Sequence, residues 1–255
     1  MKTTPPKSVL ILGLLAASLL PVAAAAPDAD QILRQMSAKL AAAQSFTFKA
    51  TRTVDPALLP GKKEPENARV AVTVQRPDKI AAHETSKQDE RKFYADGQNL
   101  TLFDVQKNLY SIVPMQASID GLVEEVEQKY GFTPPLAEIA MSDVYKDIHQ
   151  KAQSVSYLGQ TSEGGEACHR LALSGKVVNA ELWIGVSDQL PKRLVATVNG
   201  RPGKPQVKLE FSDWNLAANL TDKDFAFVPP AEALKISMIT IEEAAAAQKK
   251  HKDTN

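Results

Sequence analysis

Short runs in which apolar and polar residues alternate cover most of this chain, and they limit its possible folds more than any other feature. Alternation with a period of two places the apolar side chains on one face of a β-strand. Residues 45–53 show it, because Phe46, Phe48 and Ala50 alternate with polar residues. Turn signals such as Asp96-Gly97 separate the runs at hairpin spacing. The pattern predicts an antiparallel sheet of about ten strands.

Helical segments interrupt these runs. Residues 28–44 and 118–130 carry apolar residues at helical spacing, and two shorter helices are expected near residues 133 and 142–149. A sheet of so many strands should curl or close, and helices must cover its apolar face. We therefore predict a mainly β (α+β) protein that forms one domain.

The first 26 residues have the layout of a secretory signal peptide. Lys2 and Lys7 precede an apolar run, Val9–Leu20, and a proline then precedes a row of alanines. The run is shorter than the roughly 20 residues that a membrane span needs. We predict that residues 1–25 are a signal peptide and that the protein is exported to the periplasm. The alternative is a short buried helix.

Charge and cysteine content exclude several classes of partner. The chain has 30 basic and 30 acidic residues, and without Lys2 and Lys7 it would carry 28 basic residues. It therefore lacks the basic surplus that nucleic-acid binding requires. Its single cysteine, Cys168, can form neither an internal disulfide nor a multi-cysteine zinc site.

No motif for catalysis or cofactor binding stands out. The sequence has no GxSxG, HExxH or phosphate-binding glycine motif. Cys168 and His169 are neighbours within a predicted strand, so they should point to opposite faces, with the cysteine buried and the histidine exposed. We predict no catalytic residues, no metal and no cofactor, although a triad assembled from distant loops is left open.

Four motifs, in order, resemble the LolA-like superfamily of periplasmic lipoprotein carriers. They are an "RP-x-K" strand end, a "DG…L…YD" hairpin, an "LWI…LP-x-R" hairpin and a closing "F-x-F-x-PP", at residues 76–80, 94–104, 182–194 and 225–230. This resemblance implies an unclosed antiparallel β-barrel that covers internal helices. It assigns residues 26–236 to that domain and leaves residues 237–255 as a charged tail, either helical or disordered.

Other motifs resemble a bacterial family of predicted periplasmic proteins of uncharacterised function within that superfamily. They lie at residues 121–136, 164–169 and 213–214. The sequence between the first hairpin and the "LWI" strand differs from that of the true carriers, so their activity does not transfer directly.

The implied fold would enclose an apolar cavity suited to an acyl chain. We expect its wall to consist of the apolar residues that share one face of the strands: Phe46, Phe48, Val72, Val74, Leu100, Leu102, Leu182, Ile184, Leu209 and Phe211. We expect the stripe Leu122, Val126 and Tyr130 to act as a lid. The same phase predicts that Thr101 points outward and tolerates a charge, whereas Leu102→Asp destabilises.

Three hypotheses for function follow. The first is a non-catalytic, monomeric periplasmic carrier of acyl lipid or lipoprotein acyl chains, with a transient membrane-protein partner. The second is an envelope sensor or scaffold domain that binds protein partners through the same fold. The third is an enzyme, which would require a polar group essential for turnover.

Overall fold

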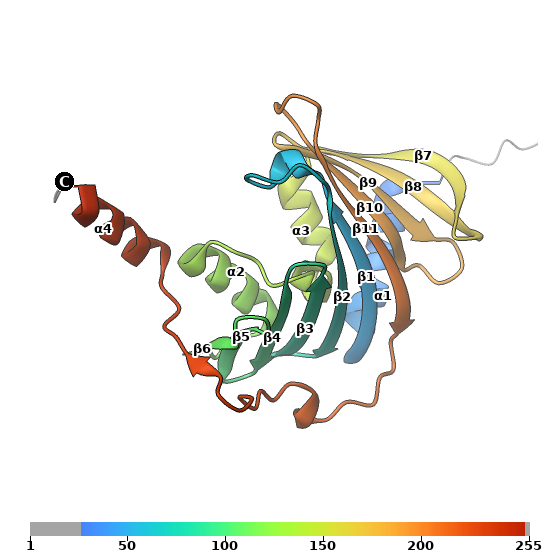
Figure 1. The fold of residues 1–255 in the computed structure, drawn as a ribbon. Helices are drawn as coiled ribbons and strands as arrows, with labels where there is room; N and C mark the ends of the chain where they lie inside the picture. The colour runs from blue at the N-terminus through green and yellow to red at the C-terminus, as the bar shows by residue number, and fades with distance from the viewer. Residues whose placement is uncertain (1–26, 253–255) are drawn as a thin grey trace, which may run out of the picture.

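The structure is a computed structural model that describes residues 27–252 and contains one sheet of twelve strands (Figure 1). The strand order is β12-β6-β5-β4-β3-β2-β1-β11-β10-β9-β8-β7, so β12 and β7 are the two edges and the sheet is not closed. The mainly β, unclosed fold is thus confirmed, with antiparallel pairing everywhere except between β12 and β6. The count exceeds the predicted number of about ten partly because β12 has two residues, too few to alternate. The predicted signal peptide lies outside the described residues.

The first half of the sheet is a meander in which consecutive strands pair. It comprises β1 (Ser45–Val54), β2 (Glu66–Gln75), β3 (Lys79–Ser86), β4 (Glu90–Asp96), β5 (Asn99–Asp104) and β6 (Leu109–Pro114). The turn between β4 and β5 needs Gly97, whose φ is +89°, a value that glycine adopts without strain. The short strand β12 (Leu234–Lys235) pairs parallel to β6.

The second half is a meander of β7 (Ser154–Glu163), β8 (Glu166–Ser174), β9 (Val178–Gly185), β10 (Pro191–Val198) and β11 (Gln206–Asn215). Strand β11 pairs with β1 and so joins the two halves. Strand β7 contains a β-bulge. A register shift at Gly159, whose φ is +112°, lets the strand continue to Glu163 as a bulge.

The three helices that precede α4 (Ile241–Lys252) lie on one face of the sheet, which we call the inner face (Figure 1). Helix α1 (Ala29–Ala42) precedes β1, and α2 (Ile119–Tyr130), the 3-10 turn η2 (Ala137–Ala140) and α3 (Val144–Lys151) connect β6 to β7. Because β6 and β7 lie near opposite edges, this connection must cross the inner face. Ser118 caps the start of α2, and Gly131 ends it in the left-handed conformation. Among the described residues, no helix is long and apolar enough to cross a membrane.

Two apolar cores fill much of the space between helices and sheet. The first joins β1–β5 and β11 to α2 and η2, with Phe46, Phe48 and Leu100 at most 1% exposed. The second joins α1 and α3 to β8 and β9. Trp214 stacks on Phe48 with ring centroids 4.5 Å apart. The strand phase predicted from alternation is therefore the phase that buries the aromatic residues.

The segment after β11, residues 216–236, runs along the opposite, outer face toward β6, and we call it the C-terminal strap (Figure 1). Phe227 packs against Tyr94, Phe103 and Tyr110, with ring centroids 5.3–5.8 Å apart. Lys79 donates a hydrogen bond to Asp222 of the strap at 2.5 Å. The strap gives the outer face of β4–β6 a second apolar layer.

This layer corrects the prediction for Thr101. Its side chain does point to the outer face, beside Tyr94 of β4 and Ile112 of β6. It is nevertheless only 5% exposed, whereas Leu102 on the inner face is half-buried. The assumption that Thr101 is exposed is therefore wrong, because alternation identifies a face but not what covers it, and we now expect a charge at Thr101 to destabilise the protein.

Candidate functional site

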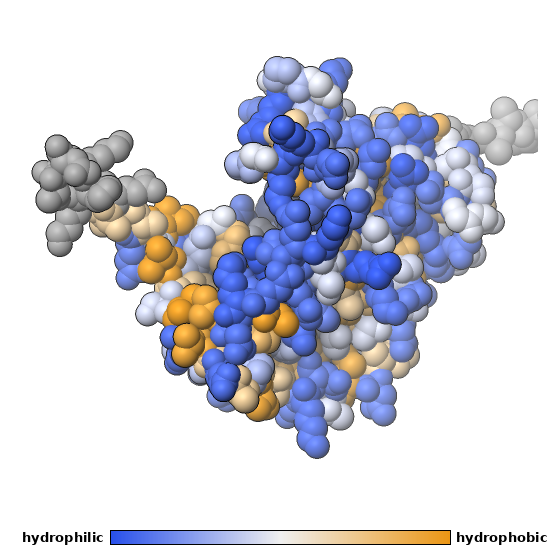
Figure 2. All heavy atoms as spheres, in the orientation of Figure 1, coloured by the Kyte–Doolittle hydropathy of each residue, from blue (hydrophilic) through white to orange (hydrophobic). Residues whose placement is uncertain are grey.

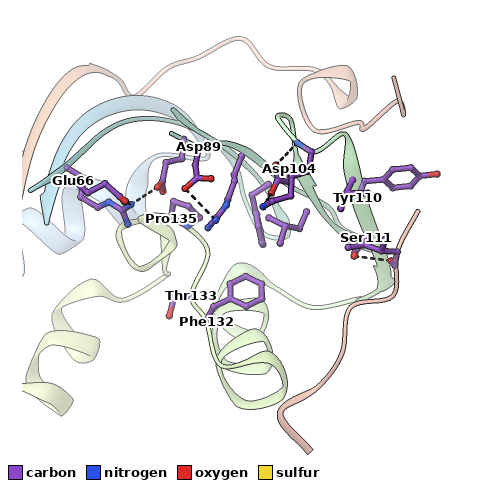
Figure 3. Close-up of a pocket in the computed structure, with 16 residues that line it drawn as sticks. Glu66, Asp89, Asp104, Tyr110, Ser111, Phe132, Thr133 and Pro135 are labelled. Atoms are coloured by element: carbon purple, nitrogen blue, oxygen red, sulfur yellow. Dashed lines mark hydrogen bonds and ion pairs between the residues drawn. The ribbon is translucent and has the colours of Figure 1, made fainter. Parts of the chain in front are cut away.

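Within residues 27–252, the helices do not fill the inner face completely, and two of the spaces that remain are large enough for a ligand. The first, of about 600 Å³, lies between β1–β6 and the loop after α2 (Figure 3). Phe93 and Leu102 of the sheet and Phe132 of the loop give it an apolar floor. In Figure 3, Phe132 and Thr133 approach from the α2 side, while the ring of Tyr110 points away. We call this space the charged-rim cavity.

Its rim is made of ion pairs. Arg52 Nη2 lies 2.5 Å from Glu84 Oε1 and 3.5 Å from Glu66 Oε1. Lys107 Nζ lies 2.7 Å from Asp104 Oδ2. Burial acts to raise the pKa of Asp104, but hydrogen bonds from Lys107 outweigh it and hold that pKa below its usual value. The rim is therefore lined by charged side chains that are paired with one another.

The second cavity, of about 710 Å³, lies between α3 and the inner face of β8–β10. We call it the apolar groove, because aliphatic side chains make up most of its wall: Ile148, Ala152, Leu173, Val177, Val178, Ala180, Leu194 and Ala196. Val177 is 68% exposed and Val178 is 40% exposed, so aliphatic surface reaches solvent there. Most monomeric proteins expose such residues singly rather than beside a cavity.

One acidic residue, Glu138 of η2, lines the apolar groove together with Lys151 and Lys176. The residue is half-buried, and desolvation raises the pKa of its carboxyl. In the described part of the chain, no basic nitrogen lies within 4.0 Å of its carboxyl oxygens. Glu138 thus places a carboxyl without an ion-pair partner in mostly aliphatic surroundings.

The segment from Phe132 to Glu138 separates the two cavities. Phe132, Thr133 and Pro135 line the charged-rim cavity, and Glu138 lines the groove. Between them, Leu136 adopts φ +59°, a left-handed conformation that costs a non-glycine residue about 1–3 kcal/mol. Leu136 packs against the first core, which holds the segment in this conformation.

The structure places the predicted wall residues mainly behind the helices. Nine of the ten are at most 7% exposed and belong to the two cores. The tenth, Leu102, is half-buried and lines the charged-rim cavity. In the predicted lid, Leu122 and Val126 are buried in the first core, while Tyr130 is half-buried and lies 6.4 Å from Phe132 between ring centroids.

The cysteine–histidine pair is part of the sheet packing. Cys168 is buried, as predicted, and burial raises the pKa of its thiol, which disfavours the nucleophilic thiolate. His169 is half-buried rather than exposed, because the Tyr157 ring lies 5.8 Å away between centroids. Among residues 27–252, no group of three or more His, Cys, Asp or Glu residues could hold a metal ion.

Comparison with protein families decides the relationship. A family model described as "Predicted periplasmic protein (DUF2092)" matches residues 29–239. The chain belongs to the DUF2092 family. The match confirms the resemblance to predicted periplasmic proteins and agrees with the expected export of the DUF2092 chain. No match was found among curated proteins.

Several solved structures are similar to this DUF2092 protein. An uncharacterized conserved protein from Thermus thermophilus is 13% identical, with a TM-score of 0.49 over 82% of this chain and 98% of that chain. A chain of the MucA/MucB complex from Pseudomonas aeruginosa is 12% identical, with a TM-score of 0.43 over 79% of this chain and 62% of that chain. The LolA superfamily protein NE2245 from Nitrosomonas europaea is 14% identical, with a TM-score of 0.37 over 79% and 99%. Because these TM-scores lie below 0.5, the proposals below rest on residues of the DUF2092 chain itself.

Sequence reasoning missed the apolar groove of this DUF2092 protein. Its wall combines α3 with three strands that follow later in the chain, and much of its room comes from the small residues Ala180 and Ala196. The one local signal is Glu138, an acidic residue between apolar neighbours in Ala137-Glu138-Ile139-Ala140. Such a residue indicates either a solvated turn or a polar group turned into an apolar space, and only the fold distinguishes the two.

Proposed function

We infer that this protein is a non-catalytic periplasmic binding or carrier protein for acyl lipid or lipoprotein acyl chains, and that the apolar groove receives the chain. The observation that carries this proposal is the groove itself, an aliphatic cavity left between α3 and β8–β10. Its volume of about 710 Å³ falls within the range of small-molecule sites, about 300–1,000 Å³. Leu194 and Ala196 offer the chain a wall on one side and Ile148 a wall on the other.

The energetic reason for such a wall is the cost of carrying a chain through water. Transfer of an acyl chain from a bilayer to water costs about 0.8 kcal/mol per CH₂, on the order of 12 kcal/mol for roughly 16 carbons. A soluble carrier must return most of this free energy by covering the chain with apolar surface. The aliphatic wall of the groove can supply such apolar surface.

The charged-rim cavity suits an acyl chain less well. A chain in it would lie against Arg52, Glu84 and Asp104 and would remove their ion pairs from solvent, which is unfavourable. The nine buried wall residues enter the proposal as a second layer behind the helices. Seven of them lie in the first core with α2, so a chain could reach them only if α2 moved, whereas Leu182 and Ile184 lie in the second core with α1 and α3. We keep α2, with Leu122 and Val126, as the proposed lid over that layer.

Native mass spectrometry of the mature protein from a periplasmic extract tests the proposed function. The expected result is an adduct of acyl-lipid mass at one copy per protein, which is released when the same sample is denatured. A ligand-free mass, combined with no adduct after incubation with acyl-lipid micelles, would contradict the proposal.

One observation favours the alternative function of binding a protein partner. Leu234, Ile239 and Ile241, at the end of the C-terminal strap and the start of α4 (Ile241–Lys252), are 48–65% exposed. Figure 2 shows hydrophobic atoms gathered along this part of the surface. Exposed aliphatic residues in such a row are typical of interaction sites. This alternative predicts a ligand-free protein that cross-links to a membrane-protein partner through this segment, and serine at these three positions should abolish the cross-link.

A further inference from the structure

The carboxyl of Glu138 is the feature of the apolar groove that packing does not explain. The first core buries its neighbours Ala137 and Ala140 completely, so η2 is anchored and Glu138 is held at the groove. Among the described residues, its side-chain oxygens meet no hydrogen-bond donor other than the N–H of Glu138 itself. An apolar side chain at this position would line the groove at no electrostatic cost.

Leaving this carboxyl without a partner on another residue is unfavourable. Desolvation penalises its charged form and raises its pKa. Lys151, the basic residue that acts on it electrostatically, is engaged with Asp147, with Nζ 2.9 Å from Oδ1. Glu127 and Asp147 add negative charge that further disfavours the carboxylate. Neighbouring side chains therefore do not neutralise Glu138 in this arrangement.

A ligand could supply the hydrogen-bond donor that the Glu138 carboxyl lacks. A chain in the groove brings its first polar group with it, and a donor on that group would meet a half-buried acceptor that already lacks a partner on another residue. Hydrogen bonds to charged groups contribute more than bonds between neutral groups. The penalty is then removed only when the groove is occupied by a ligand of the right chemistry.

We propose that Glu138 selects acyl ligands with an N–H donor beside the chain, either the amide of an N-acylated amine or the ammonium group of an amine lipid. This inference rests on the proposed function, because it assigns a polar recognition element to the same groove. Both sources present the same chemistry, an N–H directed at the carboxyl oxygens. An ester-linked chain offers only acceptors and leaves Glu138 without a partner.

Calorimetric titration of the full mature protein with three 12-carbon ligands tests the inference. The ligands are dodecylamine, N-methyldodecanamide and methyl dodecanoate, which differ in the group beside the chain. We expect the amine or the amide to bind roughly tenfold or more tightly than the ester. Equal affinities for all three would overturn the inference while leaving the proposed function intact, and no binding of any ligand would overturn both.

Two substitutions distinguish the amide from the ammonium group as the N–H donor. Glu138→Gln keeps an acceptor but loses the charge, so it should preserve a preference for the amide and abolish one for the amine. Glu138→Leu should abolish either preference while retaining the affinity for the ester. This variant should fold, because removing a desolvated charge that lacks a partner is neutral or stabilising. Glu124→Gln, on the exposed side of α2, is the matched control and should change nothing. A preference that survives in Glu138→Leu would overturn the inference.

Discussion

Thr101→Asp is expected to lower the free energy of unfolding by about 3 kcal/mol or more, because it places a carboxylate without a partner under the C-terminal strap. Thr101 is 5% exposed and lies between Tyr94 and Ile112, in a layer that Phe227 covers. The new charge would lose its water and would meet only apolar or aromatic neighbours across the sheet. Urea denaturation followed by tryptophan fluorescence measures the effect.

Two control variants distinguish charge burial from damage to the strand. Thr101→Val keeps the shape and the β-propensity, so it should be neutral or slightly stabilising. Leu102→Asp, one residue along, should cost less than Thr101→Asp, because Leu102 is half-buried and faces a cavity that already contains Asp104 and Arg91. If Thr101→Asp changed stability by less than about 0.5 kcal/mol, the effect of an ordinary surface substitution, the strap would not cover this face.

Ala196→Trp is expected to reduce acyl-lipid binding at least tenfold, because an indole at this position would fill the apolar groove. Ala196 is a small residue of the groove wall, directly across from Ala180 in the register of β9 and β10. The measurement is the fraction of protein that carries a lipid adduct in native mass spectrometry, together with the dissociation constant for a fluorescent fatty acid.

Val195→Trp is the matched control for this substitution. Val195 precedes Ala196 in β10, so its side chain lies on the outer face, and it lines a polar depression there rather than the groove. The same added volume should therefore leave lipid binding unchanged. Equal losses in the two variants would mean that the indole acts through the stability of β10 and not through the groove.

The antiparallel pairing of consecutive strands could be predicted from the hairpin turn signals, and the phase of their side chains could be predicted from local alternation. Phe46 and Phe48 are buried as their period predicts, and Asp96-Gly97 makes the expected turn. The pairing of β1 with β11 has no local signal, yet it follows once both strands must bury one face against the same helices. The need to bury apolar faces against the same helices thus favours pairing between strands that are far apart in the sequence.

The burial of Thr101 and the apolar groove could not be predicted, because they depend on segments whose sequences have no apolar periodicity. The C-terminal strap has no regular alternation of apolar and polar residues, so its sequence does not indicate where it packs. The sequence of β5 likewise does not indicate that another segment covers Thr101. The apolar groove is a space left between α3 and the strands. Apolar periodicity predicts which faces pack together, but it does not predict where packed elements leave a space. Most of the predicted wall residues form the cores for the same reason, since an apolar stripe is first of all a packing surface.

Photo-cross-linking tests most directly whether the apolar groove holds the acyl chain. A fatty acid with a diazirine at mid-chain is bound to the mature protein, irradiated, and located by peptide mass spectrometry. We predict that the labelled residues lie on α3 and the inner face of β8–β10, with Leu173, Leu194 and Ile148 among them. Labelling confined to the outer face, to the charged-rim cavity or to the C-terminal strap would contradict this account.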